Sequence, residues 1–137
     1  MSSAFWDDLS RDLEDPEFRQ AYIAESVRIA TIDSVVNALD EAREAESLSK
    51  AELARALHTE PATMRRLFTS GGANPTLGTL AEVAAAVGMR ITVEPMSEEE
   101  RAVVTKPLRD KRFTATKRFA REIHRIRATS LKHTVGR

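Results

Sequence analysis

The sequence predicts an all-α fold. Most of its 137 residues lie in alanine-rich or charge-rich segments whose apolar residues recur every three or four positions, which is the period of an amphipathic helix. Five Gly and five Pro separate these segments. The length and the 42% hydrophobic content suit one small domain with appendages.

Three helices are expected before residue 46. Phe5, Trp6 and Leu9 share one face of the first helix, and Pro16 takes the first position of the second helix after a cap at Asp15. Asp33 is expected to cap the third helix. The predicted ranges are 4–13, 16–30 and 33–45.

Two short helices with a tight corner are predicted next. Ser49 and Glu52 form a capping box that starts a helix over residues 50–57. After a break at residues 58–60, Pro61 suits the first position of a second helix that ends at Phe68. Two helices joined by about three residues cannot stack coaxially, so this segment has the outline of a helix-turn-helix.

The second short helix separates its residues into two faces. Apolar spacing predicts that Met64, Leu67 and Phe68 point inward. Small or basic side chains are left outside, where they suit a DNA major groove: Ala62, Thr63, Arg65 and Arg66. The plainer interpretation of this arginine pair is a solvated helix surface, but the order of the surrounding elements favours DNA contact.

Residues 48–93 resemble the Cro/repressor-type (xenobiotic-response-element) helix-turn-helix family. Lys50, the pair Leu53–Ala54, the loop 70–76 with its paired glycines, and the apolar run Leu77–Gly88 follow that family's order and spacing. The resemblance implies a compact five-helix domain over residues 32–95. The DNA-contacting residues that it implies are Lys50, Thr59, Glu60, Ala62, Thr63, Arg65, Arg66, Asn74 and Thr76.

Two residues depart from the family pattern. His58 stands at the corner where the family often has Gly, which leaves the turn geometry open. Glu60 stands where Ser is common, and its carboxylate either repels phosphate or accepts a hydrogen bond from a cytosine amino group.

The leader, residues 1–31, adds a second resemblance. Asp15–Phe18 followed by Tyr22 is similar to the leader of HigA-like addiction-module antitoxins, whose partners are RelE/ParE-type toxins. Such toxins are expected to be basic, and the acidic N-terminal helices suit them. The candidate partner-binding residues are therefore Phe5, Trp6, Phe18 and Tyr22, although Phe18 and Tyr22 equally suit a core role.

The charge is strongly segregated. Residues 1–100 contain 9 Lys and Arg against 19 Asp and Glu, whereas residues 101–137 contain 12 against 2. The basic tail, residues 96–137, is expected to start with a helix capped by Ser97, to include a linker over 105–112, and to end in a helix from Thr114 or Thr116. Phe119, Ile123 and Ile126 are expected to form one apolar stripe on that helix. Three roles for that last helix remain open: packing on the domain, clamping the DNA backbone, or binding a partner.

The alternation from Arg90 to Glu94 is compatible with one short strand. A lone strand needs a partner, and the same strand of a second subunit would supply it. This favours a homodimer.

Other functional classes find little support in the residues. His58, His124 and His133 are isolated, and no metal or cofactor motif is present, so we expect neither an enzyme nor a cofactor. The chain has no cysteine, an acidic N-terminus without a signal peptide, and no apolar run of membrane-spanning length. We therefore expect a cytoplasmic location and no membrane partner.

Together these features predict a dimeric transcriptional repressor that binds a double-stranded DNA operator, and favour the antitoxin and autoregulator of a type II toxin–antitoxin operon. Two alternatives remain. One is a stand-alone or phage-type repressor without a toxin. The other is a protein-interaction module that has lost DNA binding.

Overall fold

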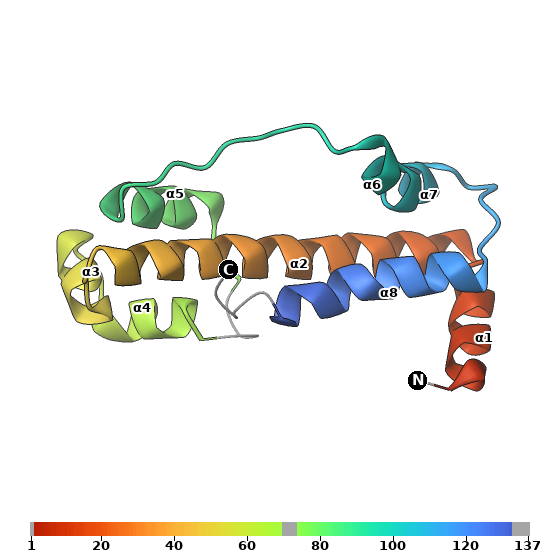
Figure 1. Ribbon diagram of the computed structural model, residues 1–137, viewed down its shortest axis with the longest axis horizontal. Coiled ribbons are helices and arrows are strands. Elements are labelled where there is room, and N and C mark those ends of the chain that lie inside the picture. The colour runs from red at the N-terminus through yellow and green to blue at the C-terminus, as the bar shows by residue number, and fades with distance from the viewer. Residues whose placement is uncertain (1, 70–73, 133–137) are drawn as a thin grey trace. The chain divides into compact units, whose positions relative to one another are not determined.

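The computed structural model describes residues 2–69 and 74–132, and all regular secondary structure within them is helical (Figure 1). This confirms the predicted all-α fold. The helices are α1 (Ser3–Asp12), α2 (Pro16–Ala45), α3 (Lys50–Ala56), α4 (Pro61–Leu67), α5 (Leu77–Ala86), α6 (Glu98–Val103), α7 (Thr105–Arg109) and α8 (Lys117–Lys132).

The chain divides into two compact units. The first unit joins Met1–Ala30 with Glu94–Ser130, and the second unit consists chiefly of Thr31–Val93. The segments that the sequence presents as a leader and a tail therefore build one unit together. Helix α2 contributes residues to both units.

The prediction of separate helices over 16–30 and 33–45 was wrong, because α2 is continuous from Pro16 to Ala45. Neither Gly nor Pro lies between Ala30 and Asp33 to interrupt the backbone hydrogen bonds. Asp33 is a half-buried residue inside the helix and caps nothing.

The second unit is built around one apolar cluster. Met64 and Val83 are among its most buried side chains, and Ile32, Phe68 and Ile91 pack at its margin. Side chains of α2, α3, α4 and α5 form this cluster, which packs the short helices α3 and α4 against the longer helices α2 and α5. Its buried residues are Val36, Leu39, Leu53, Ala54, Met64, Leu67, Leu80, Val83, Ala84 and Val87.

Three helices of the second unit end in the same way. Ser47 after α2, His58 after α3 and Gly88 after α5 all have positive φ, at 57°, 55° and 79°. In each case the next N–H donates to a carbonyl five residues back, as the Thr59 N–H does to the Ala54 oxygen at 2.9 Å. These terminations set the corners between successive helices.

The predicted strand at 90–94 is not formed. Among the described residues, 90–97 carry no helix or strand and no backbone pairing, so that prediction was wrong for the single chain. A strand requires a neighbouring strand to satisfy its backbone groups, and the described chain offers none. Val93 is accordingly 99% exposed. The paired glycines of the loop expected over residues 70–76 lie outside the described residues.

The first unit has its own apolar core. Side chains of α1 and α2 meet those of α8, and the predicted stripe on α8 is confirmed, since Phe119 and Ile123 are buried and Ile126 packs against them. The buried residues of this core are Leu9, Leu13, Ile23, Val104, Phe119, Ala120 and Ile123.

The linker predicted over 105–112 is instead partly helical. Thr105–Arg109 form α7, and Pro107 is fully buried. Proline suits this helix because the lost N–H falls in its first turn. The carbonyl of Pro107 accepts a hydrogen bond from the buried Arg19, a contact for which the local sequence has no indication.

Candidate nucleic-acid interface

Local capping chemistry defines α3 and α4. The Ser49 hydroxyl accepts the Glu52 N–H at 3.0 Å, and the Glu52 carboxylate accepts the Ser49 N–H at 2.8 Å. These bonds lower the pKa of Glu52, because they favour its ionised form. His58 then turns the chain with its left-handed backbone, and Pro61 starts α4. The predicted corner is therefore built with His58 in the place of Gly.

The faces of α4 agree with the prediction. Met64 and Leu67 are buried and Phe68 packs partly on the core, whereas Arg65 and Arg66 are exposed. No described residue forms an ion pair or hydrogen bond with either guanidinium group. Together with exposed Ala62 and half-buried Thr63, these arginines form the outer surface of α4.

Two cations flank the ring of Phe68. The Lys50 Nζ lies 6.0 Å from the ring centroid, and the guanidinium carbon of Arg43 lies 5.7 Å from it. Arg43 is largely buried, binds Asp40 at 2.9 Å and donates to the Leu48 carbonyl at 2.6 Å. Arg43 thus fixes the turn that leads into α3, a role that sequence analysis missed because nothing in the local pattern distinguishes it from a surface arginine.

The loop before α5 lies beside α4. A shallow hollow of about 330 Å³ is lined by Thr63 and Arg66 from α4 and by Asn74 and Thr76 from this loop. Four of the predicted contact residues are therefore brought together. The Thr76 hydroxyl, however, accepts the Thr79 N–H at 3.1 Å and lies 3.0 Å from the Thr79 hydroxyl, so it serves as the cap of α5.

Thr59 and Glu60 occupy the corner itself. Thr59 is half-buried and its N–H is engaged by the Ala54 carbonyl. Glu60 precedes α4 with an exposed side chain that makes no capping hydrogen bond. Its carboxylate is therefore available at the same end of α4 as Ala62, and it places a negative charge beside the candidate surface.

Three of the four predicted partner-binding side chains are used inside the first unit. The rings of Phe5 and Trp6 lie edge-on to His124, at 5.6 and 5.5 Å between centroids. The Tyr22 hydroxyl lies 3.1 Å from His124 Nδ1, and burial raises the pKa of Tyr22. Those rings are not free for a partner, because α8 already engages them. Phe18 stacks on Tyr22 and is the one exposed side chain of these four, at 38% of its full accessible surface.

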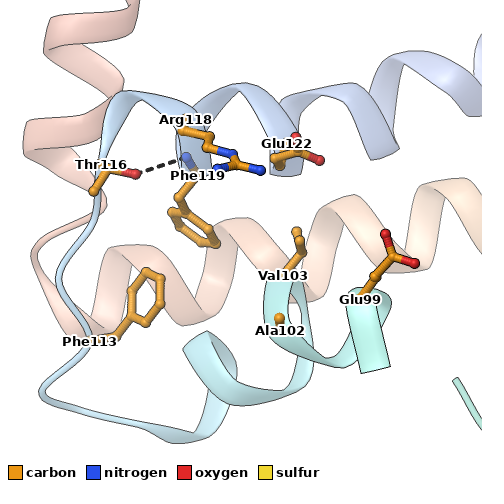
Figure 2. A pocket seen from close by; sticks show the side chains of 8 residues that line it. All are labelled: Glu99, Ala102, Val103, Phe113, Thr116, Arg118, Phe119 and Glu122. Atoms are coloured by element: carbon orange, nitrogen blue, oxygen red, sulfur yellow. Dashed lines mark hydrogen bonds between the residues drawn. The ribbon is translucent and has the colours of Figure 1, made fainter. Parts of the chain in front are cut away.

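A second hollow of about 390 Å³ lies within the first unit (Figure 2). Its apolar wall includes Val103, Phe113 and Phe119, with the two phenyl rings 4.7 Å apart. Thr116 at its edge accepts the Phe119 N–H at 3.1 Å and so caps the start of α8. Glu99, Arg118 and Glu122 supply a rim of mixed charge.

Within residues 2–69 and 74–132, no three His, Cys, Asp or Glu side chains are grouped so as to hold a metal ion. None of the helices in that part of the chain combines the length and apolar content needed to cross a membrane. Comparisons of the chain with protein-family models, with curated proteins and with solved structures each found no match.

Proposed function

We propose that this protein is a dimeric, sequence-specific DNA-binding repressor, and that it acts as the antitoxin and autoregulator of a type II toxin–antitoxin operon. The observation that carries the DNA-binding part is the outer surface of α4. It combines small side chains with two arginines that no described residue neutralises, on a helix whose other face is anchored in the core.

The chemistry of this surface suits a major groove. Arg65 and Arg66 have the forked donors that bind a guanine edge or a phosphate, and Ala62 and Thr63 allow close approach. Lys50 and Asn74 flank α4 and would hold the duplex through its phosphates. In a homodimer, two copies of α4 would bind half-sites about 34 Å apart.

A titration of the protein against its own promoter, with fluorescence anisotropy as the readout, tests this part. Arg65→Ala should cost about 1–3 kcal/mol and relax the preference at one base position. Lys50→Ala should weaken every duplex alike and flatten the salt dependence by about one unit.

Arg28→Ala is the matched control, because Arg28 is an exposed arginine of the first unit. It should leave operator affinity unchanged. Sedimentation should give a dimer. If neither Arg65→Ala nor Lys50→Ala alters affinity, α4 is not the contacting helix.

The antitoxin part rests on the acidic leader and its resemblance to HigA-like proteins. Because α8 engages Phe5, Trp6 and Tyr22, we propose that the toxin would bind exposed Phe18 and its acidic neighbours Glu14 and Glu17. A basic RelE/ParE-like toxin would meet this surface with complementary charge.

Point variants test the toxin surface better than removal of residues 1–31, because those residues build the core of the first unit. Glu14→Lys with Glu17→Lys should abolish co-purification with a small basic protein encoded beside this gene. Glu46→Lys with Glu82→Lys makes the same charge change in the second unit and should leave the co-purification intact. The antitoxin role is refuted if no such protein is encoded beside this gene. The proposed toxin surface is refuted if the two double variants bind that protein equally well.

A further inference from the structure

The second unit has too little positive charge to bind DNA tightly by itself. Thr31–Val93 contains six Lys and Arg against eight Asp and Glu, and Lys132 and Arg137 of its second segment bring the unit only to a net charge of zero. Duplex affinity depends mainly on cations that replace condensed counterions at phosphates. A DNA-binding protein with this second unit therefore needs phosphate contacts from another part of the chain.

Residues 106–112, here called the basic corner, supply such cations. Lys106, Arg109, Lys111 and Arg112 are all exposed, and no described carboxylate forms an ion pair with any of them. The Asp110 carboxylate within the corner instead accepts the Arg112 N–H at 2.9 Å. Several other exposed cations of the first unit are ion-paired, as Lys117 is with Asp7 at 2.7 Å, whereas Arg118 and Arg121 of α8 form no ion pair with a described carboxylate.

The fold holds the basic corner with its carbonyls inward. Arg19, which is fully buried, donates to the carbonyls of Pro107 at 3.1 Å, Asp110 at 2.7 Å and Phe113 at 3.5 Å. Gln20 binds the Leu108 carbonyl in the same way, at 3.1 Å. With its backbone turned toward α2, the corner presents its four basic side chains on the outside, on a folded segment that requires no ordering upon binding.

We propose that the basic corner is a second DNA-binding surface, one that contacts phosphates without sequence preference. This inference rests on the proposed DNA binding of α4 and assigns to the first unit a share in it. A membrane surface is the poorer partner for these cations. An interfacial helix needs a free apolar face, and Phe119 and Ile123 of α8 are buried in the unit.

The test replaces the four cations by glutamine, as K106Q/R109Q/K111Q/R112Q. Affinity is measured for the promoter duplex and for a duplex of unrelated sequence over a series of KCl concentrations. Each lost phosphate contact lowers the slope of log K against log salt by about 0.9, so the slope should fall by about three to four. Both duplexes should be weakened by the same factor.

A matched control removes the same net charge from ion-paired cations of the first unit. R11Q/R28Q/K117Q/R125Q eliminates cations that face Asp8, Glu25, Asp7 and Glu122. Its slope should change by less than about one, because these groups are neutralised locally. The charge-conserving K106R/K111R should behave as the wild type. Circular dichroism confirms that each variant is folded.

The outcomes separate this inference from the proposed function. An unchanged slope in the glutamine variant, or an equal fall of the slope in the control, overturns the proposal that the basic corner binds DNA. The proposal that α4 binds the operator still stands in that case if R65A loses its base preference. Loss of binding to anionic vesicles without any change for DNA also overturns it. If the wild type binds neither duplex, both proposals fail together.

Discussion

His58 forms the corner between α3 and α4, a position for which the sequence resemblance predicts Gly. Its φ of 55° is left-handed, where Gly has no steric cost and where His is more tolerated than most side chains. The hydrogen bonds that close α3 are nevertheless made. The corner is therefore of the expected kind, with a small amount of backbone strain.

Replacing this residue should relieve the strain. His58→Gly should raise the free energy of unfolding by about 1 kcal/mol, the typical cost of a side chain in the left-handed region, measured by urea denaturation. His58→Ala is the control and should give no such gain, since it keeps the Cβ. A lower midpoint for the Gly variant would contradict the left-handed assignment.

Arg19 donates hydrogen bonds only to backbone carbonyls among the described residues, and its guanidinium carbon also lies 5.5 Å from the centroid of the Phe113 ring. Its guanidinium also reaches the Leu13 carbonyl at 2.9 Å, so it joins the end of α1 to α7 and to the segment before α8. Carbonyls at helix C-termini carry partial negative charge, which suits a buried cation.

Arg19→Met should cost about 2–4 kcal/mol of unfolding free energy, because several buried carbonyls would lose their donor. Thermal or urea unfolding measures this cost. Arg28→Met on the same helix, where Arg28 is exposed, should change stability by less than about 0.5 kcal/mol. Equal effects for the two variants would show that the carbonyl contacts of Arg19 contribute nothing.

The residue-level predictions succeeded where periodicity decides the outcome. The inward and outward sides of α4 follow from three- and four-residue spacing, and so does the stripe on α8. Arg19 was missed because its acceptors Pro107, Asp110 and Phe113 lie about ninety residues away. The sequence could not reveal the real neighbour of Phe5 and Trp6, His124, which is still more remote along the chain.

At the scale of elements, boundaries were predictable where local chemistry marks them. Ser49, Pro61 and Ser97 start helices where expected, and Gly88 ends one. The helix break predicted at residues 30–33 was wrong because no such local chemistry ends the helix there. Asp33 is a residue type that often caps helices, but no residue there prevents the helix from continuing.

The capping box of α3 has a pH dependence that can be measured. Its hydrogen bonds lower the pKa of Glu52, so its contribution to stability is present above the ordinary carboxyl pKa of about 4.3 and is lost as pH falls through the lowered value. Ser49→Ala keeps the N–H of residue 49, which lowers this pKa most, and removes the hydroxyl, so in an NMR titration the pKa of Glu52 should rise only part of the way toward that ordinary value. It should also destabilise the protein by about 1 kcal/mol.

Ser97→Ala provides the control for this titration. Ser97 forms an equivalent capping box with Glu100 in the first unit, so its loss should leave the Glu52 titration unchanged. If Glu52 titrates identically in the wild type and in Ser49→Ala, the Ser49 hydroxyl contributes nothing to the lowered pKa of Glu52.

At the scale of the whole molecule, the described residues form two apolar cores, each with its own set of buried side chains. This division was beyond sequence analysis, because it joins both ends of the chain across more than sixty intervening residues. Stability should therefore be distributed in two cooperative parts.

Core truncations should reveal the two parts by hydrogen exchange. Ile123→Ala should cost about 2–4 kcal/mol and accelerate amide exchange in α1 and α8 more than in α3 and α5. Leu53→Ala should give the reverse pattern. If either variant accelerates exchange uniformly over the chain, the two cores unfold as one.

The coil at residues 89–97 has a consequence for how the chain can be divided. A break between Val93 and Glu94 would produce two fragments, and the first unit needs both, because Ile23 comes from one fragment and Ile123 from the other. The protein is thus suited to fragment complementation. One piece would contain the α4 arginines, the other would contain the basic corner, and reassembly would couple them without a covalent link.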